Sequence, residues 1–206
     1  MKIRQLLMFS FLVVPGVTAW AQDVPQIVQQ HCVSCHGADG VGTRPAMPHL
    51  DGQLEKYLVD TMTKFRKGSL PTEVPNHIPG GLTESDLETI AKHYAANKAQ
   101  RPVQQVDPDK VARGETVFRS RCADCHMDNG RDADKDAPLM AAQNLEYMIQ
   151  QNKLFASGKR KFGFLQDDAF KGLSMDELEA VAHFLASQDR VAPEAPKAGK
   201  KKKVAR

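Results

Sequence analysis

The chain has 206 residues, of which 41% are hydrophobic and 26% are charged, and its formal net charge at pH 7 is +3. A chain of this length can hold one domain or two small domains. Two positive charges lie in residues 1–21 and six lie after residue 194, which leaves a net charge of −5 on residues 22–194. The body is therefore acidic and the tail is basic, and we expect no nucleic-acid partner.

The first 21 residues have the pattern of a secretory signal peptide. A basic start with Lys2 and Arg4 precedes an apolar stretch at residues 6–14 and an Ala-Trp-Ala cleavage site at residues 19–21. The alternative is an uncleaved membrane anchor, but the apolar stretch is short for a membrane span. No other stretch of the sequence is apolar enough to cross a membrane. We therefore expect an exported protein.

A short segment with helical character, Val24–Gln30, leads into Cys-Val-Ser-Cys-His at residues 32–36, and Cys-Ala-Asp-Cys-His follows at residues 122–126. Two thiols three positions apart lie on one helical turn, where both can form thioethers with one porphyrin. The adjacent histidine can then bind its iron. We predict two covalently bound haem c groups, attached through Cys32, Cys35, Cys122 and Cys125, with His36 and His126 as the proximal iron ligands. Because thioether attachment is completed outside the cytoplasm, the predicted localisation is the bacterial periplasm.

Two other kinds of chemistry use paired cysteines. A Cys-x-x-Cys pair can be a redox dithiol or half of a zinc site. A zinc site built from both pairs leaves the two histidines unexplained and needs about 15–20 residues between the pairs, far fewer than separate them here. Haem attachment accounts for every residue of both motifs.

The two motifs belong to an internal repeat, which sets the number of domains. Six residues recur at an offset of 90, namely Cys32, Pro48, Gln53, Tyr57, Phe65 and Gly68 as Cys122, Pro138, Gln143, Tyr147, Phe155 and Gly158. After one inserted residue the offset is 91, so that Leu82, Leu87 and Ala91 match Leu173, Leu178 and Ala182. We predict a signal peptide (1–21), a first domain (22–97), a linker (98–109), a second domain (110–190) and a tail (191–206).

The local patterns within each repeat are helical. Apolar residues recur at helical spacing in the middle of each half, over residues 54–65 and 145–155. The last helix of each half opens with a capping box, Thr83-x-x-Asp86 and Ser174-x-x-Glu177. No alternating strand pattern with hairpin turns stands out. The predicted fold class is all-α.

The basic tail contains the run Lys200–Lys203. A short run of like charges is usually a disordered, solvated segment. The alternative is electrostatic docking of this tail to an acidic partner or to an anionic membrane surface. The sequence does not choose between these roles.

Two tandem Cys-x-x-Cys-His motifs, each followed by a Pro-x-Leu/Met-x-x-Gln-x-x-x-Tyr helix and a closing Leu-Thr/Ser…Leu…Ala helix, resemble the di-haem class I cytochromes c. This group includes the c-four type cytochromes and the haem subunit of flavocytochrome c sulfide dehydrogenase. The resemblance covers about Val24 to Gln188. It implies two small helical domains packed together, haems close enough to exchange electrons, and a role as a periplasmic electron carrier. It also places the proximal ligands at His36 and His126.

The sequence departs from this family at the second, distal iron ligand. Family members place a methionine in the loop before the last helix, and neither loop here (Ser69–Gly81 and Lys159–Gly172) contains one. In the first loop His77 is the strongest candidate for the distal ligand of haem 1, ahead of His49 and Met47, and its alternative role is an exposed loop histidine. For the second haem, the candidate ligands in the loop are Lys159, Lys161 and Lys171. Met127 and Met140 lie outside this loop and are candidates at unusual positions. The alternative is an open sixth coordination site.

Three functions fit these features. The first is single-electron transfer, as a free carrier or as the haem subunit of an oxidoreductase, with a periplasmic dehydrogenase or a terminal oxidase or reductase as the redox partner. The second is a haem enzyme and the third a gas or redox sensor, each using an open site on the second haem. No cysteine remains to serve as a nucleophile and no catalytic motif appears, so we expect an electron-transfer protein rather than an enzyme.

Overall fold

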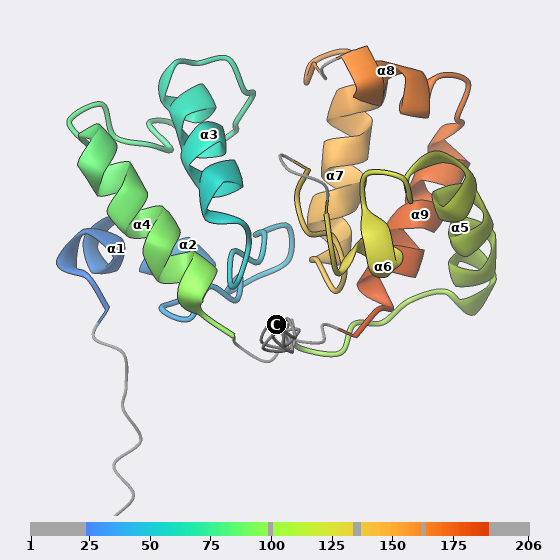
Figure 1. Cartoon of the computed structure of the whole chain (residues 1–206), viewed down its shortest axis with the longest axis horizontal. Coiled ribbons are helices and arrows are strands. Elements are labelled where there is room, and N and C mark those ends of the chain that lie inside the picture. Colours follow the sequence, from blue (N-terminus) through green and yellow to red (C-terminus); the bar gives the residue numbers. More distant parts are fainter. Residues whose placement is uncertain (1–23, 99–100, 134–136, 162–163, 190–206) are drawn as a thin grey trace, which may run out of the picture.

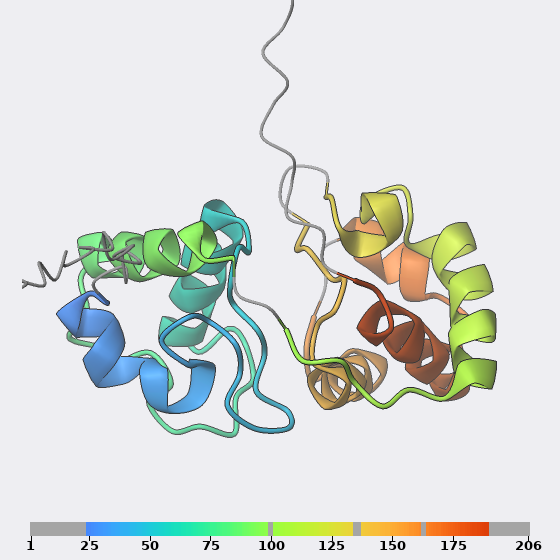
Figure 2. The same ribbon diagram turned by 90° about the horizontal axis from the view of Figure 1, so that it is seen from below.

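The computed structural model describes residues 24–98, 101–133, 137–161 and 164–189, without the side chains of residues 164 and 165. Within these ranges all regular elements are helices and no strand occurs. Two helical bodies lie side by side and are joined by an extended segment, as Figure 1 and Figure 2 show. The all-α class and the division into two domains are confirmed. The predicted signal peptide and the predicted tail lie outside the described residues.

The first domain contains α1 (Gln26–His31), α2 (Val33–His36), α3 (Glu55–Arg66) and α4 (Glu84–Ala96). The apolar face predicted around residues 54–65 forms α3, which packs beside α4. Helix α1 crosses α4 at the other side. The buried core where these helices meet consists of Val28, Leu58, Ile90, Ala91 and Tyr94.

The second domain contains α5 (Pro108–Arg121), α6 (Met127–Gly130), α7 (Leu145–Ala156), α8 (Phe164–Phe170) and α9 (Met175–Ala186). Its core lies between α5, α7 and α9, where the rings of Phe118 and Phe184 are 5.2 Å apart. Helix α9 is the most deeply buried helix, because it packs against both α5 and α7. None of the described helices combines the length and the hydropathy needed to cross a lipid bilayer.

Equivalent backbone hydrogen bonds confirm the register of the repeat. The N–H of Gly52 donates to the carbonyl of Tyr94 over 2.7 Å, and the N–H of Ala142 donates to the carbonyl of Leu185 over 2.8 Å. The two donors are 90 positions apart and the two acceptors are 91 positions apart, so the inserted residue lies between them, as predicted. Both predicted capping boxes are also present, at Thr83 and Ser174.

Two short helices lie outside the stretches that were predicted to be helical. Helix α8 lies within the loop at Lys159–Gly172, and α6 directly follows His126 of the second motif. Helix α6 is a single turn in which Asp128 and Asn129 have φ angles of 46° and 55°. Asp and Asn are the non-glycine residues that tolerate this left-handed conformation best, so the sequence permits the turn without predicting it.

Helices α5 and α9 approach most closely at Gly114. This glycine is buried, and a Cβ atom placed on it would lie 2.0 Å from the carbonyl oxygen of Ala180 and 2.9 Å from the amide nitrogen of Val181. Both of those atoms belong to the backbone and cannot rotate away. The absence of a side chain at Gly114 therefore sets the separation of the two helices.

We expect Gly114→Ala to lower the free energy of unfolding by about 1–3 kcal/mol, because overpacking forces the helices apart. In an exposed helix the same substitution raises stability by about 1 kcal/mol. Gly81→Ala is the control, since a Cβ there meets no atom within 4 Å. Denaturant unfolding of the holoprotein measures both variants, and equal stability of the two would contradict this account of the crossing.

Candidate haem sites and the contact between the domains

Each Cys-x-x-Cys-His motif forms a tight turn at the end of the first helix of its domain. Cys32 is the C-cap of α1, and its carbonyl accepts a hydrogen bond from the N–H of His36 over 2.9 Å. Cys122 is the C-cap of α5, and its carbonyl accepts from the N–H of His126 over 3.0 Å. The turn brings each cysteine pair and its histidine to the same place in each domain, as the motif spacing predicts.

The imidazole of each motif histidine is held by a proline carbonyl. Nδ1 of His36 lies 3.1 Å from the carbonyl oxygen of Pro48, and Nδ1 of His126 lies 2.9 Å from that of Pro138. A carbonyl only accepts, so Nδ1 carries the hydrogen and Nε2 of the neutral ring keeps its lone pair. A histidine must present such a lone pair to bind a metal ion.

Burial keeps both imidazoles in this neutral form. Desolvation lowers the pKa of His36 to about 4, against the smaller raising effect of its bond to Pro48, and His77 lowers it further. Desolvation also lowers the pKa of His126, again opposed by the proline carbonyl. Both rings are therefore uncharged near neutral pH.

The loop that carries each proline is folded back by a glycine. Gly40 and Gly130 have φ angles of 92° and 83°, a conformation that favours glycine. Their carbonyls accept hydrogen bonds from the N–H groups of Leu50 (2.7 Å) and Met140 (2.8 Å). Each loop thus returns to the motif two residues after its proline.

The environment of the thiols argues against the two alternative chemistries. Burial raises the pKa of Cys32 and of Cys122 to about 11. A redox dithiol needs the opposite, a thiol whose pKa is lowered. A zinc site needs the two cysteine pairs together, but they lie in separate domains (Figure 1). Thioether formation removes the thiol proton permanently and is compatible with both observations.

His77, the predicted distal ligand of haem 1, lies opposite His36. The ring centres of the two histidines are 6.1 Å apart and their planes differ by 17°. His77 also packs against Phe65, with ring centres 4.6 Å apart. Its Nδ1 atom is buried and has no hydrogen-bond partner among the described residues. Desolvation lowers the pKa of this histidine as well.

The other predicted candidates occupy different surroundings. His49 is buried at the contact between the domains, where its Nδ1 accepts a hydrogen bond from the N–H of Gly42 over 3.0 Å. Lys159, Lys161 and Lys171 are all exposed. Of the candidates for the first iron, His77 is the one whose ring centre lies 6.1 Å from that of His36.

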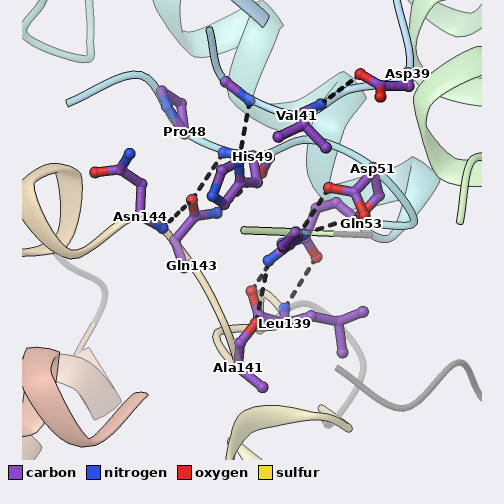
Figure 3. Close-up of polar contacts among 12 residues, drawn as sticks. Asp39, Val41, Pro48, His49, Asp51, Gln53, Leu139, Ala141, Gln143 and Asn144 are labelled. Carbon is purple, nitrogen blue, oxygen red and sulfur yellow. Dashed lines mark hydrogen bonds and ion pairs between the residues drawn. The ribbon is translucent and has the colours of Figure 1, made fainter. Parts of the chain in front are cut away.

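The two domains are joined by a reciprocal pair of glutamines, which Figure 3 shows. The side chain of Gln143 accepts from the N–H of His49 (2.8 Å) and donates to its carbonyl (2.9 Å). The side chain of Gln53 accepts from the N–H of Leu139 (2.9 Å) and donates to its carbonyl (3.0 Å). Because Gln53 and His49 are the repeat equivalents of Gln143 and Leu139, the two contacts are related by a pseudo-two-fold axis.

Arg101, from the segment between the domains, joins the two halves at a second point. It donates through Nε to the Asp51 carboxylate (2.9 Å), through Nη2 to the Asp51 carbonyl (3.1 Å) and through Nη1 to the Ala141 carbonyl (3.1 Å). The side chains of Arg101 and Asp51 are only 4% and 0% exposed. This residue lies in the predicted linker (98–109), and the sequence pattern there predicts no contact for it.

Two helical domains, each with a cysteine pair and a neutral histidine at the end of its first helix, define a di-haem protein of the c type. A family model described as cytochrome c matches residues 21–95 and again residues 111–189. The chain belongs to this family.

Known proteins with two such domains are similar to this chain. Cytochrome c4 of Pseudomonas aeruginosa (strain PAO1) is 33% identical over 138 residues, which cover 63% of this chain and 68% of that protein. The thiosulfate dehydrogenase electron acceptor of Thiomonas intermedia (strain K12) is 26% identical over 183 residues, covering 82% of this chain and 83% of that protein. The crystal structure of reduced cytochrome c4 from Pseudomonas stutzeri has a TM-score of 0.69 and 26% identity, covering 82% of this chain and 100% of that one.

The protein thus binds two covalently attached haem c groups and transfers electrons, as a carrier or as the haem subunit of an oxidoreductase. The residues of the first domain fit such a group, because an imidazole with a fixed tautomer faces a second, half-buried imidazole whose buried Nδ1 has no hydrogen-bond partner among the described residues. The resemblance predicted from the motifs is confirmed, as is the number of haems.

We expect Gln143→Met to lower the free energy of unfolding by about 1–3 kcal/mol, since it leaves the buried N–H and carbonyl of His49 without their partner. Gln150→Met is the control, because Gln150 is exposed on α7, the helix that follows Gln143. Denaturant unfolding of the two variants measures the difference. If both variants unfold at the same denaturant concentration, the glutamine contact contributes nothing to stability.

We expect Arg101→Met to cost about 3–5 kcal/mol, because it leaves the buried carboxylate of Asp51 without its charged partner. The double variant with Asp51→Asn removes that charge and should recover part of the loss. Thermal unfolding of the holoprotein tests both. A double variant that is less stable than Arg101→Met alone would show that the unpaired charge is not the cause.

Proposed function

We propose that this protein carries single electrons between redox proteins of the periplasm through one haem in each domain. The haems are attached covalently to Cys32, Cys35, Cys122 and Cys125. The proximal iron ligands are His36 and His126. The second ligand of the first iron is His77. When bound, each haem takes up and releases one electron. The chain positions, encloses and tunes these groups.

The separation of His36 and His77 carries the assignment of the first iron. A histidine nitrogen binds a first-row metal ion at about 2.0 Å and lies about 1.1 Å from its ring centre, so two imidazoles on opposite sides of one ion have centres about 6.2 Å apart. The two rings here are 6.1 Å apart. Contact with Phe65 and burial keep the ring of His77 in this place.

Two nitrogen ligands bear on the direction of electron flow. Methionine as the second ligand raises the potential of a haem. A pair of histidines lacks this effect, so we expect the first haem to have a lower potential than a haem with histidine and methionine ligands. A redox partner whose centre has a higher potential than this haem would therefore accept its electron.

The partner is proposed to be a periplasmic dehydrogenase or a terminal oxidase or reductase. The signal-peptide pattern of residues 1–21 supports export. The similarity to a protein named as the electron acceptor of thiosulfate dehydrogenase supports a dedicated enzyme partner. The basic tail at residues 191–206 is a further proposed contact, either with an acidic partner or with an anionic membrane surface.

Low-temperature EPR of the oxidised holoprotein tests the role of His77. We expect His77→Ala to remove a low-spin signal, because the first iron loses its second nitrogen ligand. His31→Ala is the control, since His31 is exposed next to the first motif. An unchanged low-spin signal in His77→Ala would show that another group binds the first iron.

Mass spectrometry under denaturing conditions tests the attachment points. We expect the wild-type chain to retain two haems, and the double variant Cys122→Ala with Cys125→Ala to retain one. The corresponding variant of Cys32 and Cys35 should also retain one, which controls for a general loss of haem insertion. Retention of both haems by either variant would contradict the assignment.

A further inference from the structure

The two domains differ in the loop that precedes the last helix. The turn at the end of this loop is the same in both, because the N–H of Leu82 donates to the carbonyl of Pro79 and that of Leu173 donates to the carbonyl of Phe170, each over 3.1 Å. Counting back from this shared turn places Asp168 at the position of His77. The imidazole that faces the first motif thus has a carboxylate as its counterpart in the second domain.

Asp168 lies exposed on α8, in contrast to the half-buried His77. A different ring occupies the place beside the equivalent phenylalanine: Phe170 packs on Phe155 with ring centres 5.5 Å apart, as His77 packs on Phe65. The aromatic contact is retained, but a phenyl ring has no lone pair to offer a metal ion. This face of the second domain therefore presents an apolar ring where the first presents a nitrogen.

Other possible iron ligands of the second domain are placed elsewhere. The loop Lys159–Gly172 contains no histidine or methionine, and its three lysines are exposed. Met140 packs against the core cluster of the second domain and stands at the repeat position of Leu50, which packs against the core of the first domain. Met127 is 39% exposed.

A cavity of about 310 Å³ borders the same two phenylalanines in the second domain. It is lined by Phe155, Ala156, Asp167, Phe170, Lys171, Leu173 and Leu178. At the repeat position of Ala156 the first domain has Arg66, which donates to the carbonyl of Leu82 over 2.9 Å and pairs with Glu84. The alanine at position 156 leaves this space open, and the one carboxylate and one ammonium among its lining residues give it no net charge.

We propose that the second haem accepts a small neutral ligand at its iron, on the side bordered by Phe155 and Phe170, whereas His77 closes the first haem. The inference rests on the proposed function, because it takes His126 as the protein ligand of the second iron. Two phenyl rings border this side, and the carboxylate and the ammonium among the lining residues balance each other, which favours a neutral molecule over an anion. Carbon monoxide, which binds reduced haem iron, is the probe.

The test is a carbon monoxide titration of the reduced holoprotein, followed by visible absorption. We expect the wild-type chain to bind one carbon monoxide per two haems. Asp168→His places an imidazole at the position of His77 and should reduce binding to none. Glu146→His, which adds a histidine at an exposed site on α7, is the control and should still bind one.

His77→Ala separates this inference from the assignment of the first iron, and it should bind two carbon monoxide molecules per chain. Binding of none or of two by the wild-type chain overturns the inference, as does binding of one by Asp168→His. If His77→Ala still binds only one, the role of His77 is wrong, while the result with Asp168→His continues to report on the second domain. Denaturing mass spectrometry confirms that every variant carries both haems.

Discussion

The relative position of the two domains depends on two glutamine side chains that bind main-chain groups across the contact. Gln53 and Gln143 each satisfy one N–H and one carbonyl of the opposite domain, at positions 86 and 94 residues away in the chain. Buried main-chain groups are costly to leave unpaired, so the domains cannot slide past each other without breaking four hydrogen bonds together. Arg101 adds a fixed charge pair beside them.

The duplicated fold carries two different sites. The proximal side is the same in both domains, with a proline carbonyl on each motif histidine. The loop before the last helix differs, with an imidazole beside the phenylalanine of α3 in one domain and a phenyl ring beside that of α7 in the other. A two-haem chain whose loops before the last helix differ can tune each haem separately, because each loop contacts its own domain.

The sequence predicts those features that depend on local spacing. The Cys-x-x-Cys-His motifs and the capping boxes at Thr83 and Ser174 depend on residues that are close in the chain. The repeat is recognised from the constant spacing between matching residues. The sequence makes His77 a candidate ligand because few side chains bind iron, but its distance from His36 depends on the folded loop. The roles of Gln53 and Arg101 were not predicted, because their partners include main-chain atoms of the other domain. Every residue has these atoms, so the sequence does not indicate which of them are contacted.

The pseudo-two-fold contact is of the kind that two identical chains make about a symmetry axis, since each half supplies the same donor and the same acceptor. Joining the halves in one chain turns this isologous contact into an intramolecular one, whose strength no longer depends on protein concentration. A single chain can also carry different residues at equivalent positions, which a symmetric dimer of identical chains cannot. Asp51 and Ala141 stand at equivalent positions, so a single arginine serves one carboxylate and one carbonyl. Two identical halves would bury two carboxylates and need two arginines.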